Sequence, residues 1–270
     1  QAGINITASH NPKEYNGYKV YWSDGAQLPP QHAAAIAREL EQIDIFTGIR
    51  RMEFDDAKAQ GLIEIMGAET DERFMSHVMA MVNDRESMAK VADTFHMVYT
   101  PFHGCGWKLV PEALRGLGVK HLHCVPEQMV LDGSFPTVVS PNPENPEGFY
   151  LAIQLADKVG ADFILGTDPD SDRVGIAVPD GDKYVLFTGN EVGAMLLEYI
   201  CKERIAAGTM PANPVAVKTI VTTDLVKAIA AKYGVELREV LTGFKFIGEQ
   251  IGFLEAEGHP ERYIFGFEES

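Results

Sequence analysis

The sequence predicts an α/β fold, with consecutive α/β domains whose mixed sheets are sandwiched by helices. Strand-like and helix-like patterns alternate along the whole chain. Apolar runs also end three times in a polar loop, at "MVYTPFHG", "FILGTDPD" and "KTIVTTD". This succession is typical of α/β units, whose ligands gather beyond the carboxyl ends of the strands. Those loops are therefore the first places to search for functional residues.

Length and composition allow several domains with real cores. The chain has 270 residues, of which 46% are hydrophobic, and this content excludes a disordered chain. The alternation of patterns predicts three domains, at 1–90, 91–187 and 188–270. The sequence opens on "QAGINITASHNP" without Met and closes on "YIFGFEES", a strand-like run that stops at a loop. We expect it to be a piece of a longer protein.

Charge and cysteine content restrict the partners. The chain carries 39 acidic and 23 basic residues, a formal net charge of −16, whereas binding to nucleic acid phosphates needs a basic face. No apolar run approaches the roughly 18 to 20 residues of a membrane span, and no signal peptide pattern is visible. The three cysteines lie far apart, without the spacing of a zinc site or a disulfide framework. We expect a cytoplasmic protein that binds neither nucleic acid nor membrane; its oligomeric state stays open.

The first domain shows two strands and two helices. Residues 3–8 and 17–22 have the pattern of short strands. Residues 29–44 begin with proline and are rich in Ala, Leu, Glu and Arg, which predicts a helix. Residues 70–82 predict another helix, because Met and Phe recur at helical spacing. The polar and then apolar stretch at 84–92 marks the first domain boundary.

The other two domains repeat the alternation. In the second domain we expect a strand into a Gly-rich loop at 95–106, a helix at 110–118, a strand at 121–128 and a Pro-rich loop at 140–148. A helix at 149–160 and two strands around an acidic loop at 161–178 follow. In the third domain we expect a long helix at 188–205 with Thr188 as its N-cap, a strand into a Thr-rich loop at 214–224, and a helix at 224–234. A strand-to-helix turn within 241–250 and a strand before Glu268 follow.

The strongest local signal is "GTDPDSDR", in which Asp168, Asp170 and Asp172 alternate between two strands. Carboxylates this close repel one another, and a cation normally offsets that repulsion. Their hard oxygens select Mg²⁺ or Ca²⁺. An EF-hand is excluded, because its sixth and twelfth positions, Gly and Glu, are Arg173 and Pro179 here. A solvated acidic turn is the alternative, but the apolar runs on both sides fix the loop and favour a metal site.

A phosphate would suit the same loop. Mg²⁺ usually keeps a place for a phosphate oxygen, and the planar fork of Arg173 suits phosphate. In "TASHNP", Ser9 stands in a tight loop that turn chemistry alone would also explain. A phosphate on Ser9 would bring acceptor oxygens and negative charge to the metal. We therefore interpret Ser9 as a phosphoryl carrier.

The remaining candidates are weak when taken singly. Lys19 lies on a strand near Ser9, and His103 lies in "TPFHG". Thr242, Gly243 and Lys245 lie in a strand-to-helix turn able to bind polar ligands. Glu268, Glu269 and Ser270 place carboxylates beside a hydroxyl, which suits sugar hydroxyl groups. A surface lysine, a structural histidine and charged turns are the alternative interpretations.

Five elements in this order resemble the α-D-phosphohexomutase superfamily, which includes phosphoglucomutase and phosphomannomutase. They are "TASHNP…NGYK", "TPFHG", "DPDSDR", "TGFK" and "GFEES". The resemblance covers essentially the whole chain, and "TASHNP" together with "DPDSDR" is highly specific. The stretch "NGYKVYWSDGAQLPP" is most similar to the sequences of bacterial phosphoglucomutases, in the group that also includes phosphopentomutase and glucose-1,6-bisphosphate synthase.

The resemblance implies roles for the matching residues. Ser9 matches the phosphoserine, with His10 and Lys19 as neighbouring catalytic residues. The implied Mg²⁺ ligands are Asp168, Asp170, Asp172 and an oxygen of the Ser9 phosphate. The implied substrate-binding residues are Arg173, Thr242, Gly243, Lys245, Glu268 and Ser270.

The implied reaction interconverts hexose 1-phosphate and hexose 6-phosphate, with glucose favoured, through a phosphoserine and a sugar 1,6-bisphosphate. Phosphopentomutase, glucose-1,6-bisphosphate synthase, a metal-dependent sugar phosphatase and a non-catalytic sugar-phosphate-binding module stay open. The family has four domains, and the resemblance implies that the chain lacks the start of the first, the end of the third and all of the fourth. The resemblance therefore implies that these 270 residues alone are inactive.

Overall fold

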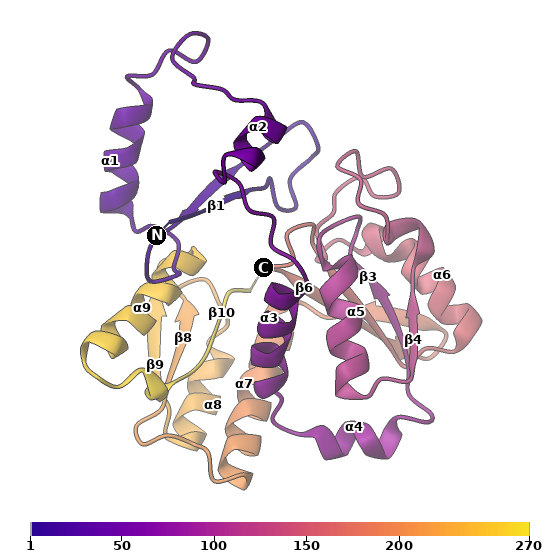
Figure 1. Cartoon of the computed structure of the whole chain (residues 1–270). Helices are drawn as coiled ribbons and strands as arrows, with labels where there is room; N and C mark the ends of the chain where they lie inside the picture. The colour runs from indigo at the N-terminus through magenta and orange to yellow at the C-terminus, as the bar shows by residue number, and fades with distance from the viewer. Residues whose placement is uncertain (1, 270) are drawn as a thin grey trace.

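The computed structural model describes residues 2–269, whose strands form three separate sheets (Figure 1). Each sheet is built from its own stretch of the chain, with helices before, between or after its strands. The expected α/β fold is confirmed, and the expected mixture of parallel and antiparallel strands is found in the second sheet. None of the helices in these residues combines the length and the hydropathy that crossing a membrane would require.

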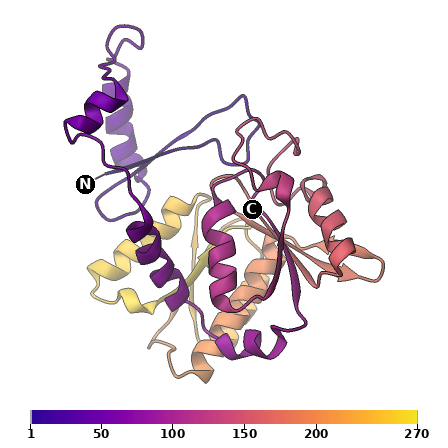
Figure 2. The same cartoon turned by 45° about the vertical axis from the view of Figure 1, so that its right-hand side comes forward.

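The first sheet is a short antiparallel pair in which Asn5 stands opposite Lys19. A helix that no pattern predicted, α2, lies between the two predicted ones, and little of this region is buried. Its elements are β1 (Gly3–Ile6), β2 (Tyr18–Tyr21), α1 (Pro30–Leu40), α2 (Phe54–Ala59) and α3 (Ala68–Ala80). Helix α3 packs against α5 of the next region, and the two lie side by side in Figure 2.

The second sheet has the strand order β4-β3-β5-β6-β7 and is mixed. Strands β4, β3 and β5 run parallel, whereas β6 and β7 return antiparallel. Hydrophobic side chains of this sheet and of α6 form one core, in which Phe102 meets Phe149 edge-on. The elements are α4 (Arg85–Val91), β3 (His96–Thr100), α5 (Gly106–Leu117), β4 (His121–Cys124), α6 (Tyr150–Val159), β5 (Phe163–Thr167), β6 (Val174–Asp180) and β7 (Lys183–Leu186), with 3₁₀ helices at Pro126–Gln128 and Pro146–Phe149.

The third sheet is parallel, in the order β10-β8-β9. Its core lies between the sheet and helices α7 and α8 on one side, and between the sheet and α9 on the other. The elements are α7 (Gly189–Ala206), β8 (Val215–Thr219), α8 (Leu225–Tyr233), β9 (Glu236–Val240), α9 (Phe244–Ala256), a 3₁₀ helix at Pro260–Arg262, and β10 (Tyr263–Phe267).

The predicted N-cap of α7 is confirmed and has a reciprocal partner. The N–H of Glu191 donates to the Thr188 hydroxyl oxygen at 3.3 Å, and the Glu191 carboxylate accepts the N–H of Thr188 at 2.8 Å. This capping box satisfies two backbone donors at the first turn. The residues that start this helix are therefore fixed by local sequence.

Two further elements lie outside those that the sequence predicts. The stretch at 84–92, where we expect the first domain boundary, contains α4, because Asp84 accepts from the N–H groups of Glu86 and Ser87 and so caps a helix. The second is strand β7, which no pattern at 183–186 predicts. Its stability comes from antiparallel pairing with β6 and not from a pattern of its own.

Candidate active site

Ser9 lies on a tight turn that its neighbours enforce. The N–H of Thr7 donates to the carbonyl of Gly17 at 3.2 Å, and a side chain at Gly17 would bring its Cβ to 2.1 Å from the Thr7 carbonyl oxygen. Only glycine therefore fits there. Ser9 itself has a φ of 53°, which is costly for a residue with a side chain. Its N–H donates to Oγ1 of Thr7 at 2.8 Å, and this bond helps to hold the turn.

The acidic loop joins strands β5 and β6 and closes on Asp168. Oδ1 of Asp168 accepts the N–H of Arg173 at 2.9 Å, and its carbonyl accepts the N–H of Ser171 at 3.0 Å. Asp168 is fully buried, while the side chains of Asp170 and Asp172 are 8% and 54% exposed. The three carboxylates therefore range from the interior to the surface.

The Ser9 turn and the acidic loop meet, although they are far apart in the sequence. The Ser9 hydroxyl donates to Oδ2 of Asp168 at 2.8 Å. Lys19, on β2, places its Nζ 2.8 Å from Oδ2 of Asp170 and 2.8 Å from Oδ2 of Asp172. The structure thus brings these five predicted residues together.

The two most buried carboxyl groups titrate as a pair. Burial, and then Asp170 beside it, raise the pKa of Asp168. Burial opposes ionisation of Asp170 too, but hydrogen bonds with Asp168 and the Lys19 ammonium outweigh it and lower the pKa of Asp170. Like charges this close disfavour double ionisation. The loop therefore attracts a positive charge.

Two basic side chains flank the Ser9 turn. Burial alone would lower the pKa of Lys19, but its bonds to Asp170 and Asp172 outweigh that effect and raise the pKa. Lys19 therefore stays charged. Burial and then the positive charge of Arg173 lower the pKa of His10. Its Nδ1 lies 3.2 Å from Oγ of Ser9, so a neutral imidazole faces the hydroxyl at neutral pH.

The acidic loop has the donor set of a site for a hard cation. One carboxylate oxygen from each of Asp168, Asp170 and Asp172 lies within 4.8 Å of the others. Oδ1 of Asp170 and Oγ of Ser171 are buried and find no hydrogen-bond partner among residues 2–269. A buried acceptor without a partner costs free energy, and a bound cation would satisfy Asp170. Carboxylate oxygens prefer Mg²⁺ or Ca²⁺, so the residues present fit such an ion.

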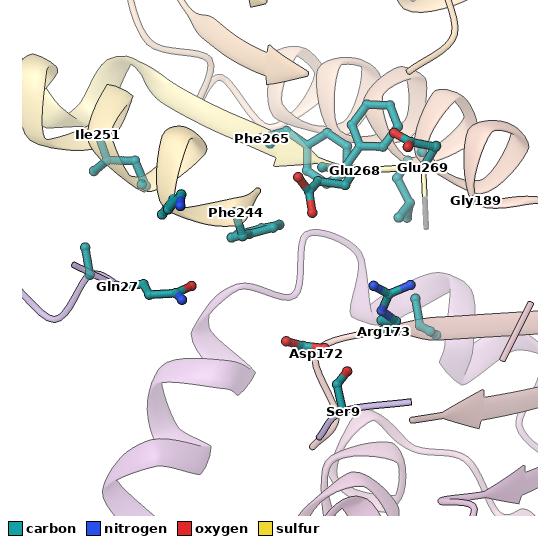
Figure 3. Close-up of a pocket in the computed structure, with 18 of the residues that line it drawn as sticks. Ser9, Gln27, Asp172, Arg173, Gly189, Phe244, Ile251, Phe265, Glu268 and Glu269 are labelled. Carbon is teal, nitrogen blue, oxygen red and sulfur yellow. The ribbon is translucent and has the colours of Figure 1, made fainter. Parts of the chain in front are cut away.

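A cavity of about 740 Å³ opens beside the two loops (Figure 3). Ser9, Asp172 and Arg173 lie on one side of it, and Phe244 and Glu268 face them from the other. Its volume lies within the range of pockets that enclose small ligands. The chain therefore places a hydroxyl, carboxylates and a guanidinium at the wall of one ligand-sized cavity.

The candidates from the third sheet divide into two groups. Lys245 and Glu268 line the cavity, whereas Thr242 and Gly243 lie beside it and are not among the described residues of its wall. The N–H of Gly243 donates to Oε1 of Glu268, which ties the turn before α9 to the end of β10. Ser270 lies outside the described residues.

Glu269 has a partner set that the sequence did not reveal. Its Oε2 accepts from Oγ1 of Thr219 at 3.0 Å and from Oγ1 of Thr222 at 2.8 Å, and both threonines are buried. The Thr-rich loop "KTIVTTD" was the only available signal. Further wall residues that no pattern singled out are Gln27, Pro143, Glu144, Phe187, Val192, Leu196, Phe244, Ile251, Glu255 and Phe265. They come from several elements that are distant in the sequence, so packing brings these elements together.

His103 is buried away from this cavity. It is 4% exposed, and it is not among the described residues of the cavity wall. Its ring nitrogens are both bonded within the second region, Nδ1 to the Val130 carbonyl and Nε2 to Thr137. The structural alternative for this histidine therefore fits the geometry.

The fold has relatives among solved structures. A putative phosphomannomutase from Thermus thermophilus superposes with a TM-score of 0.73 at 22% identity, covering 100% of this chain and 53% of that one. A phosphoglucomutase/phosphomannomutase family protein from Burkholderia thailandensis gives 0.67 at 17% identity, covering 99% and 49%. An N-acetylglucosamine-phosphate mutase, described as a member of the α-D-phosphohexomutase superfamily, gives 0.53 at 14% identity, covering 93% and 67%. The chain therefore shares its fold with these proteins.

Family models narrow this assignment. Domains I, II and III of phosphoglucomutase/phosphomannomutase match residues 1–45, 72–181 and 188–270, in that order and over most of the chain. The chain belongs to the phosphoglucomutase/phosphomannomutase family. Phosphoglucomutases of Staphylococcus aureus (strain MRSA252) and Staphylococcus epidermidis are 37% and 36% identical to it over 100% of this chain, which covers 46% and 47% of theirs. The chain thus spans about half the length of the curated relatives it matches.

Proposed function

We propose that this protein interconverts hexose 1-phosphate and hexose 6-phosphate, with Ser9 as the phosphoryl carrier and a sugar 1,6-bisphosphate as the intermediate. The observation that carries the proposal is the 2.8 Å hydrogen bond from the Ser9 hydroxyl to Asp168. It holds a potential carrier group against a cluster of carboxylates at the edge of a ligand-sized cavity. The phosphoglucomutases among the relatives favour glucose as the sugar.

In the transfer step, an oxygen of a sugar hydroxyl attacks the phosphorus and the bond from phosphorus to Oγ of Ser9 breaks. The hydroxyl proton ends on Oγ of Ser9. Nδ1 of His10, 3.2 Å from that oxygen, is the group that holds the proton during the transfer. Phosphoryl transfer depends mostly on positioning and on stabilisation of charge.

Groups on both sides of Ser9 balance the negative charge of the transferred phosphoryl group. Asp168, Asp170 and Asp172 hold Mg²⁺ in this proposal, and the bound ion supplies positive charge for the phosphoryl oxygens. Lys19 contributes a second positive charge at the same carboxylates. The Arg173 guanidinium lines the cavity and has no hydrogen bond or ion pair among residues 2–269, which leaves its fork available to a substrate phosphate.

The far wall selects the sugar in this proposal. Lys245 and Glu268 contact the sugar directly, and Thr242, Gly243 and Ser270 complete the contacts. We also propose that the domains divide at 1–90, 91–187 and 188–270, and that the protein works in the cytoplasm. The acidic composition with 39 Asp and Glu residues supports a small-molecule substrate and not a nucleic acid.

The experiment measures two half-reactions separately. The protein at the full length of its curated relatives, of which this chain spans about half, is incubated with glucose 1,6-bisphosphate and Mg²⁺, and peptide mass analysis should find one phosphoryl group, on Ser9. The phosphorylated chain is then mixed with glucose 1-phosphate, glucose 6-phosphate, mannose 6-phosphate or ribose 5-phosphate. A sugar bisphosphate should form, fastest with a glucose phosphate.

Each outcome has a distinct meaning. Preferred transfer to ribose 5-phosphate would mean that the substrate is a pentose phosphate and not a hexose phosphate. Release of inorganic phosphate in place of the bisphosphate would indicate a phosphatase. A chain that binds the sugar phosphate without phosphorylation of Ser9 would be a binding module, and the mutase proposal would be wrong.

A further inference from the structure

The acidic loop touches a turn whose backbone is unusual. Phe102 and His103 follow β3 and have φ values of 45° and 64°. Two consecutive non-glycine residues in the left-handed region are rare, and such a conformation persists only where the surroundings enforce it. The residues around this turn should therefore show what enforces it.

Hydrogen bonds of His103 hold the turn in place. Its backbone N–H donates to the Gln128 carbonyl at 3.0 Å. Nδ1 lies 2.9 Å from the Val130 carbonyl oxygen, and Nε2 lies 2.9 Å from Oγ1 of Thr137. The side chain is buried, so each of these bonds is shielded from water. One residue thus ties the turn to three positions of the 128–137 loop.

The network also fixes the form of the imidazole. The Thr100 hydroxyl donates to Oε1 of Gln128, whose Nε2 donates to Oγ1 of Thr137 at 3.0 Å. The hydroxyl hydrogen of Thr137 is then free to go to Nε2 of His103. A carbonyl can only accept, so Nδ1 carries the ring hydrogen toward Val130. The contact with the Val130 carbonyl therefore places a ring hydrogen on Nδ1.

The held turn presses against the acidic loop. A side chain at Gly104 would put its Cβ 2.3 Å from Cα of Pro169, so the two backbones touch. The N–H of Cys105 donates to the Pro169 carbonyl at 2.8 Å. Pro169 lies between Asp168 and Asp170. The position of the turn therefore sets the position of the backbone that carries both carboxylates.

We infer that His103 is a positioning residue for the cation site: through the Gly104–Cys105 backbone it fixes Pro169, and with it the separation of Asp168 and Asp170. This inference rests on the proposed role of the acidic loop. Groups that orient metal ligands without touching the metal typically contribute about 10- to 100-fold to metal affinity. We expect His103 to contribute within that range.

The test is the affinity of the 270-residue chain for Mg²⁺, measured by calorimetry without any sugar. His103→Ala should weaken binding about 10- to 100-fold. His103→Asn should recover most of the affinity, because its amide N–H reaches toward the Val130 carbonyl as Nδ1–H does, and asparagine tolerates a positive φ. Leu155→Ala, in α6 against the core, is the matched control, because it lowers thermal stability without touching the loop.

Nitrogen chemical shifts of His103 give a second readout, and they should report a hydrogen-bonded N–H at Nδ1. If His103→Ala does not fold, Thr137→Val removes the partner of His103 Nε2 and the acceptor of Gln128 Nε2 but keeps the Nδ1 bond to Val130, and it should weaken Mg²⁺ binding less. Unchanged Mg²⁺ affinity in the folded His103 or Thr137 variant would overturn the inference and leave the proposed function intact. Equal losses in His103→Ala and Leu155→Ala would also overturn it. No Mg²⁺ binding by the unsubstituted chain would overturn the proposed cofactor, and the inference with it.

Discussion

The hydroxyl of Ser9 donates a 2.8 Å hydrogen bond to Oδ2 of Asp168, and 159 positions of sequence separate the two residues. The bond joins the turn after β1 to the loop after β5, so it depends on how the first region packs on the second. Because Asp168 is fully buried, this contact also fixes the depth at which the Ser9 hydroxyl sits. The expected behaviour of the site follows from this relationship.

Replacement of Ser9 by alanine should abolish phosphorylation of the chain and lower the rate of phosphoryl transfer at least about 10³-fold, because the covalent route has no other carrier. Intact-mass analysis and single-turnover kinetics measure both effects. Ser76→Ala is a matched control, since Ser76 is exposed on α3 and its hydroxyl bonds only to the Arg73 carbonyl. A Ser9→Ala chain that still gains one phosphoryl group would place the carrier elsewhere.

Mg²⁺ should stabilise the folded chain, because the unfolded chain does not hold the three carboxylates together. At a Mg²⁺ concentration of 100 times Kd the gain is about 2.7 kcal/mol, and a chelator should remove it. Asp170→Asn should abolish most of this gain, since Asp170 offers a buried oxygen without a partner. Thermal unfolding with and without Mg²⁺ measures it. Asp182→Asn, in the exposed turn before β7, should keep the full gain; an equal loss there would argue against a specific site.

A stack of three histidines should make the second sheet sensitive to acid. The ring of His96 lies 4.4 Å from that of His121 and 5.6 Å from that of His123, centroid to centroid. Burial, and then the charges of His96 and His121, lower the pKa of His123. A folded-state pKa below the unfolded value means that the unfolded chain binds the proton more readily. The contribution of His123 to the free energy of unfolding should therefore be fully present above about pH 6.5 and be lost as the pH drops below that value.

Urea unfolding across that range measures the effect. His123→Gln should make the pH dependence shallower, because it removes the ring whose protonation the stack opposes. His77→Gln, on the exposed face of α3, should leave the slope as it is. The same slope in the chain with Gln at position 123 would show that other groups cause the acid sensitivity.

Amide hydrogen exchange should be least protected before α3. Among the described residues up to position 66, only Leu28 and Ala57 are buried hydrophobic residues, whereas Ile4 is 60% and Phe46 is 88% exposed. The second and third sheets each have a compact core. Exchange protection follows burial and local packing, so we expect the strongest protection in β3, β5 and β8. Equal protection in β1 and β5 would contradict this expectation.

Local sequence by itself determined the features that depend on neighbours a few positions apart. Alternating apolar and polar patterns predicted most helices and strands, and the cap of α7 followed from Thr188 and Glu191, three positions apart. The acidic loop could also be recognised in the sequence, since the close spacing of Asp168, Asp170 and Asp172 already implies mutual repulsion and a cation to offset it.

Tertiary structure alone decided which distant groups meet. Lys19 reaches Asp170 and Asp172, and His103 bonds within its own network away from the cavity. Glu268 and Glu269 both line the cavity, but Glu269 bonds to two buried threonines whereas Glu268 accepts the N–H of Gly243. Adjacent residues such as Glu268 and Glu269 carry the same charge and differ only in what packs beside them. The physical reason is range: turn, cap and alternation energies act over a few residues, whereas the site is formed by packing between elements that are separated by large parts of the chain.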